Sequence, residues 1–238
     1  MSFCSADFHF NIFFKCETKL IRKFTISSFR WRFTPGICTF PFSTWSGILI
    51  RISYIHGKTA LKLLILDIDE TLVHAREIPL QRDPDFKTSL YHVYKRPYVD
   101  EFLQFCREHF NVAIWTTGGS EYAQQVFEHL FPEDYPLAFL WASERCTRRY
   151  DPDRQQPYVI KNLHKLKKKG YRLEQVIMID DTPQKLEKNY GNLVAVTEWT
   201  GDANDRELLH LIRYLNVLKD ADNIRSIEKR NWQGKYKL

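Results

Sequence analysis

No stretch of the 238-residue sequence reaches the roughly 18 consecutive apolar residues that a membrane-spanning helix needs, so no transmembrane segment is expected. The chain also lacks paired cysteines. Its five cysteines are an odd number, and none forms a Cys-x-x-Cys motif (Cys4, Cys16, Cys38, Cys106 and Cys146). A disulfide framework and a zinc site are therefore disfavoured. A reducing compartment, in the simplest case the cytoplasm, is the expected location.

Acidic residues are scarce at the start of the chain. Residues 1–58 hold eight Lys and Arg against two acids, whereas the rest of the sequence holds 27 residues of each sign. The net charge of +6 and the isoelectric point near 9.0 therefore come from this first segment. The basic balance is poor support for a nucleic-acid-binding domain, and no direct nucleic-acid partner is expected.

The same segment lacks sustained helical or strand periodicity, although it holds ten of the 17 phenylalanines. We expect a poorly structured basic head over residues 1–58, a folded domain over residues 59–220, and a polar tail or helix over residues 221–238. Three interpretations of the head stay open: an organelle transit peptide, a basic arm for a membrane surface or acidic partner, and an over-extended gene start. The third would place the start at Leu61, directly on the first expected strand.

From Leu61 onward, the pattern alternates between buried strands and amphipathic helices. Apolar runs typical of buried parallel strands occupy Leu61–Leu66, Asn111–Trp115, Pro136–Trp141, Gln175–Ile179 and Leu193–Val196. Helices are expected from Pro97 to Phe110, from the Thr-Thr-Gly-Gly motif to about Leu130, over Val159–Lys169, and after a cap formed by Asp202 with Asp205. This alternation predicts an α/β fold with a doubly wound, Rossmann-like parallel sheet.

Polar residues follow three of these strands at the point where each strand ends. They are Asp67 and Asp69 after the first strand, Thr116-Thr117-Gly118-Gly119 after the second, and Asp180-Asp181 after the fourth, with Lys161 at the start of the preceding helix. Ligands of open α/β sheets bind beyond the carboxyl ends of the strands, so these groups are expected to meet at one edge.

These residue types suit phosphoryl transfer, which requires an in-line nucleophile and neutralisation of the phosphate oxygens. Asp67 can supply a carboxylate nucleophile and form an aspartyl phosphate. Asp69 is expected to protonate the leaving alkoxide and then to activate water. Because two neighbouring carboxylates do not easily both stay ionised, their coupling helps Asp69 to keep its proton.

Several carboxylates beside a phosphate repel it unless a cation neutralises part of their charge. Asp67, a backbone carbonyl near Asp69, and the pair Asp180-Asp181 offer hard oxygen ligands that suit Mg²⁺, the expected cofactor. The expected phosphate-binding groups are the Lys161 ammonium, the Thr116 hydroxyl, and the backbone N–H groups around Thr117 and Gly118.

Five segments of the sequence, in their order along the chain, resemble one family. Leu63–His74 (LLILDIDETLVH) is similar to the first motif of the haloacid dehalogenase superfamily. More narrowly, it resembles the phosphatases of the RNA polymerase II C-terminal domain, also called the NLI-interacting-factor-like family. The supporting segments are RPYVDEFL (96–103), IWTT (114–117), YVIKNL (158–163) and IMIDDTP (177–183). The resemblance spans about residues 61–200 and implies roles for Asp67, Asp69, Thr116, Lys161, Asp180 and Asp181 like those above, with Asp181 the direct metal ligand.

Departures from the family pattern leave the substrate open. The second motif reads Thr-Thr-Gly-Gly where eukaryotic members have Thr-Ala-Ser, Asp181 stands where several members carry Asn, and Arg145–Gln156 is an Arg-rich insert. Both gaps that hold a lid in metabolite-specific relatives, about Ala75–His92 and Ser143–Pro157, are too short for a folded cap domain. A phosphoserine or phosphothreonine protein is the leading substrate, and a small phosphomonoester is the alternative.

Simpler interpretations stand beside these. Asp67 and Asp69 can form an ordinary turn, Lys161 can belong to a solvated lysine-rich face, and Thr116 can merely end a strand. A lone His74 more often hydrogen-bonds its loop than catalyses. The three arginines of the insert can contact an anionic substrate or simply confer solubility (Arg145, Arg148 and Arg149). The whole domain can also be a non-catalytic binding module, as a similar domain of a mitochondrial import translocase subunit implies, although binding alone does not require this set of acids. The sequence leaves the oligomeric state open.

Overall fold

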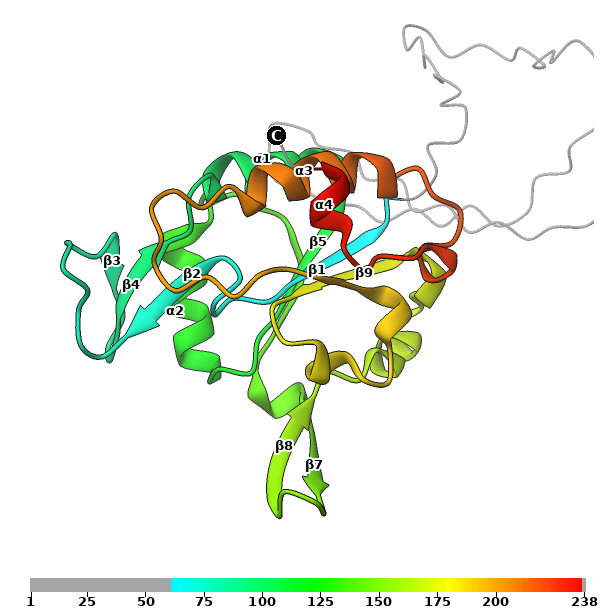
Figure 1. The fold of residues 1–238 in the computed structure, drawn as a ribbon, viewed down its shortest axis with the longest axis horizontal. Helices are drawn as coiled ribbons and strands as arrows, with labels where there is room; N and C mark the ends of the chain where they lie inside the picture. Colours follow the sequence, from blue (N-terminus) through cyan, green and yellow to red (C-terminus); the bar gives the residue numbers. More distant parts are fainter. Residues whose placement is uncertain (1–60, 237–238) are drawn as a thin grey trace, which may run out of the picture. The chain divides into compact units, whose positions relative to one another are not determined.

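Five parallel strands form the central sheet of this computed structural model, in the order β10-β9-β1-β5-β6 (Figure 1). The structure describes residues 61–236, so the expected basic head lies outside the described residues. The strands are β1 (Leu63–Leu66), β5 (Asn111–Trp115), β6 (Leu137–Trp141), β9 (Val176–Asp180) and β10 (Leu193–Ala195). The predicted α/β fold with a doubly wound parallel sheet is therefore confirmed.

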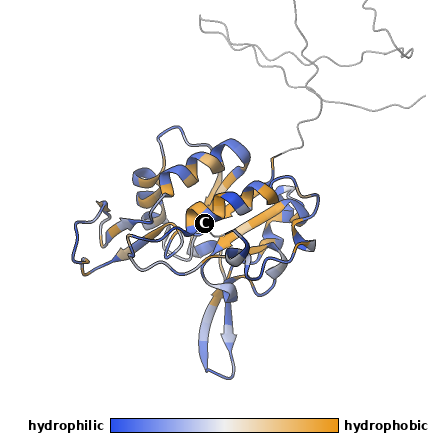
Figure 2. Ribbon diagram, turned by 45° about the horizontal axis from the view of Figure 1, so that its top comes forward, coloured by the Kyte–Doolittle hydropathy of each residue, from blue (hydrophilic) through white to orange (hydrophobic). Residues whose placement is uncertain are grey.

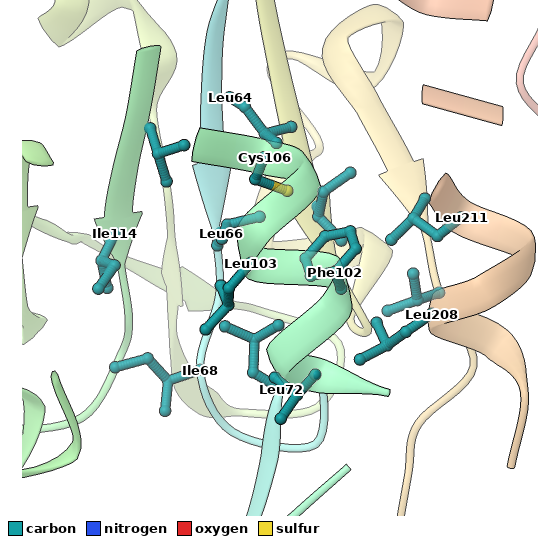
Figure 3. Close-up of a cluster of buried hydrophobic side chains, with 14 of the residues drawn as sticks. Leu64, Leu66, Ile68, Leu72, Phe102, Leu103, Cys106, Ile114, Leu208 and Leu211 are labelled. Carbon is teal, nitrogen blue, oxygen red and sulfur yellow. The ribbon is translucent and has the colours of Figure 1, made fainter. Parts of the chain in front are cut away.

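Helices pack on both faces because alternate residues of each strand point to opposite sides. On one face, Leu64 and Leu66 contact α1 (Val99–His109) and α3 (Glu207–Leu218), as Figure 3 shows for Phe102 and Leu208. The same cluster receives buried residues of α2 (Ser120–Leu130). On the other face, Leu63 and Ile65 pack with residues of the 3₁₀ helices Leu163–Lys169, Leu173–Gln175 and Pro183–Leu186.

Two small antiparallel units lie beside the central sheet. The first is a sheet of order β2-β4-β3, made of β2 (Val73–Arg76), β3 (Phe86–Lys87) and β4 (His92–Lys95). The second is a hairpin of β7 (Thr147–Asp151) and β8 (Gln156–Ile160), which projects from the domain and is hydrophilic over most of its length (Figures 1 and 2). Among residues 61–236 no large cap is present, as expected.

The predicted helix over Val159–Lys169 is wrong. Val159 and Ile160 end strand β8, and residues 163–169 form a 3₁₀ helix instead. Its buried residues, Leu163 and Leu166, are three apart, which matches the three residues per turn of a 3₁₀ helix. Gly170, at φ 84°, ends the helix in a conformation that only glycine adopts readily.

The capping of α3 also differs from the expectation. Asp205 Oδ1 accepts the backbone N–H of Glu207 at 3.1 Å, whereas Asp202 Oδ1 accepts that of Asn204 in the preceding turn. Asp205 in addition receives two hydrogen bonds from Arg96, each 2.9 Å long. The carboxylate that helps to start α3 therefore also ties it to the residues just before α1.

The chain after α3 packs back onto the domain. It contains a 3₁₀ turn over Ile224–Ser226. Two other 3₁₀ turns lie earlier in the chain, over Ser143–Arg145 before the hairpin and over Tyr190–Asn192 before β10. Helix α4 (Trp232–Tyr236) stacks the ring of Trp232 on that of Tyr214, with the ring centres 5.2 Å apart. Across residues 61–236, no helix has the length and apolar character needed to span a bilayer.

Candidate active site

Asp67 lies at the carboxyl end of β1, in the middle of the parallel sheet. Its backbone N–H donates to the carbonyl of Ile179 on β9, and its side chain is 1% exposed. Two ammonium groups contact its carboxylate: Lys161 Nζ lies 2.7 Å from Oδ1, and Lys185 Nζ lies 2.8 Å from Oδ2. Each oxygen of the carboxylate therefore has its own ammonium partner.

Lys161 joins the ends of two neighbouring strands. It follows β8 directly, its side chain is fully buried, and its Nζ also lies 2.7 Å from Asp180 Oδ2 on β9. Its backbone N–H donates to the carbonyl of Lys185 at 2.7 Å. The second lysine contacts the same acid, since Lys185 Nζ is 3.3 Å from Asp180 Oδ1. Two buried carboxylates are thus bridged by two cations.

The pKa values of Asp67 and Asp180 shift in opposite directions in this arrangement. Burial acts to raise the pKa of Asp67, but Lys161 and Lys185 outweigh it and hold the pKa below its ordinary value of 3.8. Burial raises the pKa of Asp180 to about 7, and the Asp67 carboxylate adds to the rise. Asp67 is therefore the more readily ionised of the two, as a carboxylate nucleophile requires.

Asp69 has hydrogen-bond partners of its own, on the loop after β5 and on α2. Thr116 Oγ1 donates to its Oδ2 at 3.2 Å, and the hydroxyl of Tyr122 donates to its Oδ1. Burial raises the pKa of Asp69 above its ordinary value, and the Asp67 carboxylate adds to the rise, although the hydrogen bonds from Tyr122 and Thr116 oppose it. A neighbouring pair of acids thus has one pKa lowered and one raised, the pattern of a nucleophile beside a proton donor.

Three carboxylates converge as candidate metal ligands. Asp67, Asp180 and Asp181 each offer one oxygen, and these oxygens lie within 4.8 Å of one another. Hard oxygen donors at a strand end are the ligands that Mg²⁺ prefers, so this set fits the ion. The side chain of Asp69 is turned to Thr116 and Tyr122 instead, and the predicted use of its backbone carbonyl as a ligand stays a prediction.

The loop after β5 carries the other predicted phosphate-binding groups. The Thr116 N–H donates to the carbonyl of Trp141, and its hydroxyl lies between Asp69 and the N–H of Gly118, which donates to it at 3.0 Å. Thr117 is half-buried beside it. The structure therefore brings this loop to the same strand ends as Asp69, and the roles in phosphate binding stay predictions.

Two residues of the site were not foreseen from the sequence. Lys185 lies four residues after Asp181 on the 3₁₀ helix Pro183–Leu186, which turns its ammonium back onto the acids. Tyr122 lies on the first turn of α2, so its hydroxyl faces the loop after β1. In the sequence, Lys185 lies close to Asp180-Asp181 and Tyr122 lies close to the Thr-Thr-Gly-Gly motif. Closeness in sequence does not show in which direction a side chain points.

The remaining candidates lie around the site. His74 Nδ1 contacts the Glu70 carboxylate at 2.7 Å, so it binds its own loop. Cys146 Sγ is 3.7 Å from the carbonyl of Thr116, and both described cysteines are free. The three arginines of the insert lie outside the acidic cluster: Arg145 in the turn before the hairpin, and Arg148 with Arg149 on β7.

Comparisons with known proteins show which family the chain resembles. The profile of the NLI interacting factor-like phosphatases matches residues 62–225. A probable C-terminal domain small phosphatase of Dictyostelium discoideum is 30% identical over 194 residues, covering 77% of this chain and 60% of that protein. CTD small phosphatase-like protein 1 of Caenorhabditis elegans is 34% identical over 171 residues, covering 68% and 33%.

A solved structure of the fission yeast RNA polymerase II CTD phosphatase Fcp1 is 20% identical with a TM-score of 0.46, covering 68% of this chain and 51% of that one. The chain therefore spans less than two thirds of the length of each of these relatives. The family match covers more than half of the chain, including every motif of the candidate site. This chain belongs to the NLI interacting factor-like phosphatase family, as the resemblance of its motifs predicted.

Proposed function

We propose that this chain is a magnesium-dependent phosphomonoesterase that works through an aspartyl phosphate on Asp67. The observation that supports it most strongly is that the pKa values of Asp67 and Asp69 are shifted in opposite directions. Lysine ammonium groups keep Asp67 ionised, whereas burial and the Asp67 charge favour a protonated Asp69. A site that only binds phosphate has no need of a carboxylate and a carboxylic acid side by side.

In the first step, the Asp67 carboxylate attacks phosphorus and the bond from phosphorus to the ester oxygen breaks. Asp69 gives its proton to the departing alkoxide. Lys161, buried against Asp67, holds the nucleophile in one orientation. A magnesium ion held by Asp67, Asp180 and Asp181 would supply positive charge for the phosphate oxygens.

In the second step, the Asp69 carboxylate takes a proton from a water molecule that attacks the phosphorus of the aspartyl phosphate. The bond between phosphorus and Asp67 breaks, and inorganic phosphate leaves. Thr116 and Tyr122 bind both oxygens of Asp69, so they keep it oriented while it changes from acid to base. The same residue thus serves both steps.

A phosphorylated serine or threonine side chain of a protein is the proposed substrate. In support, the connections that would carry a lid form only a three-stranded sheet and a two-stranded hairpin. An uncovered site admits a side chain on a large partner, whereas a small metabolite is easier to enclose under a cap. The relatives bear names of C-terminal domain phosphatases, which agrees with a protein substrate.

The test is hydrolysis of an aryl phosphate by the wild type and by Asp67→Asn, each with Mg²⁺ and with a chelator. We expect turnover only in the wild type with Mg²⁺. Activity that survives Asp67→Asn would show the nucleophile to be wrong, and a wild type without activity would favour the binding-module alternative. Phosphoserine peptides and sugar phosphates are then compared by kcat/KM. Equal values would favour a small-molecule phosphatase.

A further inference from the structure

Lys185 contacts all three of the acids that converge at the ends of β1 and β9. Its Nζ lies 2.8 Å from Asp67 Oδ2, 3.3 Å from Asp180 Oδ1 and 3.2 Å from Asp181 Oδ1. These are the same three residues that form the candidate metal site. A single ammonium therefore lies at the meeting point of the acidic cluster.

The ammonium of Lys185 lies on the more exposed side of the cluster. The side chain is 16% exposed, against 1% for Asp67 and 0% for Asp180. Lys185 is thus the outer cation of the cluster, and Lys161, which is fully buried, is the inner one.

The backbone of Lys185 is held by two hydrogen bonds, whereas only its ammonium anchors the side chain. Its N–H donates to the carbonyl of Thr182 at 3.0 Å, and its own carbonyl accepts the N–H of Lys161 at 2.7 Å. The next residue, Leu186, is completely buried. A lysine has four flexible side-chain bonds, so its ammonium can move several ångströms without any change in this backbone.

We propose that Lys185 is an internal cation that binds the acidic cluster in the metal-free protein and must leave it before a divalent ion can bind. This inference rests on the proposed function, because it takes Asp67, Asp180 and Asp181 as the metal ligands. Magnesium binds oxygens at about 2.1 Å, so an ion between these carboxylates needs the space and the lone pairs that the ammonium now uses. Two cations at one point also repel each other.

The consequence is a weakened apparent affinity for metal. The contacts between the Lys185 ammonium and the carboxylates must break before the ion enters. The apparent binding constant for Mg²⁺ is therefore the intrinsic constant multiplied by the fraction of protein in which the ammonium has already left the cluster. In return, the acids are not left as uncompensated buried charges when no metal is bound. Lys185 would thus tune the metal requirement of the site and keep the metal-free domain folded.

The alternative is that Lys185 is a fixed part of the site that stays on Asp67 when metal is present. In that case its removal would disorder the carboxylates and weaken metal binding, or leave the affinity unchanged. The two possibilities predict opposite changes in a binding constant, so a measurement that does not depend on turnover separates them.

The experiment is calorimetric titration of metal-stripped full-length protein with magnesium chloride. We expect Lys185→Met, which keeps the apolar stem and removes the charge, to bind Mg²⁺ about tenfold more tightly than the wild type. The matched control is Lys188→Met, because Lys188 is an exposed lysine three residues further along the same segment. It removes the same formal charge and should stay within about twofold of the wild type.

Thermal unfolding gives an independent measurement on the same proteins. In chelator, Lys185→Met should unfold at a lower temperature than the wild type, and Mg²⁺ should raise its unfolding temperature by more than it raises that of the wild type. If the methionine variant does not fold without metal, Lys185→Gln is titrated instead, with the same expectation. Affinity equal to or weaker than that of the wild type in the variant that folds would overturn the proposal.

Asp181→Ala separates this inference from the proposed function. It should lose most Mg²⁺ binding in the same titration because it removes one of the three candidate oxygen ligands. A wild type that binds no Mg²⁺, or an Asp181→Ala variant that binds normally, would contradict the proposed metal site itself. Normal wild-type binding with no gain in the Lys185 variants would contradict only the competition between the Lys185 ammonium and the metal ion.

Discussion

The hydroxyl of Tyr122 on α2 donates a hydrogen bond to Asp69 Oδ1, across 53 residues of sequence. The other oxygen of Asp69 accepts a hydrogen bond from Thr116. The carboxyl group thus has a partner on each side, and both partners come from the strand–loop–helix unit that begins with β5. The orientation of the proposed acid–base group is therefore controlled by a part of the chain far from its own loop.

Replacing Tyr122 by phenylalanine removes one of these two partners. We expect kcat to fall on the order of tenfold, with a smaller change in KM, because Asp69 is proposed to act in the chemical steps. The Tyr122 hydrogen bond lowers the pKa of Asp69, so its loss should raise that pKa further and move the alkaline limb of the kcat profile to higher pH. An unchanged kcat and an unchanged limb would mean that Tyr122 does not position Asp69.

Gly118 is the place where an added methyl group disturbs the same contact. A Cβ atom there would lie 2.9 Å from Cδ1 of Tyr122, too close for a carbon–carbon contact, so the ring must shift. Gly118→Ala should therefore lower kcat in the same direction as Tyr122→Phe. Gly119→Ala is the control, since a Cβ at Gly119 meets nothing within 4 Å. Equal kcat values for the two alanine variants would contradict this account.

The pH dependence of the first step should follow the proton on Asp69. Its pKa is raised above 3.8 by burial, so the acid form persists to higher pH than in an exposed aspartate and is lost as the pH rises through the raised value. The rate of phosphoryl transfer from a phosphoserine peptide should fall over that range. Asp69→Asn should remove this limb, and it should slow alkyl esters more than aryl esters, whose leaving groups need less protonation. A limb that remains in the variant would assign the proton to another group.

A buried ion pair away from the acidic cluster should matter for stability. Arg96, 1% exposed, donates to both oxygens of Asp205 and also to the carbonyl of Thr71 at 3.2 Å. Asp205→Asn leaves this guanidinium buried without a full counter-charge, so the free energy of unfolding in urea should fall by about 3 kcal/mol. The control is Asp134→Asn, which breaks an exposed pair with Arg107 and should change stability little. Equal effects of both variants would contradict the importance of burial for this pair.

The strands of the central sheet were predictable because each is a short, uninterrupted apolar run. Leu63–Leu66 is buried at every position, as expected for a strand covered on both faces. The segment Val159–Lys169 was not predictable in the same way, since Ile160, Leu163 and Leu166 fit an α-helix nearly as well as a strand followed by a 3₁₀ turn. The pairing of β8 with β7 decided between them, and pairing partners are not visible in a local pattern.

The sequence alone determined most of the chemical groups of the candidate site, although not Lys185 or Tyr122: two acids follow one apolar run, two follow another, a threonine loop lies between them, and a lysine precedes the last run. Their types and order follow from the chain, and parallel strands place their carboxyl ends at one edge. Only the tertiary structure decided which acid each cation contacts. The direction of a side chain on a turn, such as that of Lys185 toward Asp67 or of Tyr122 toward Asp69, depends on packing between segments distant in the chain.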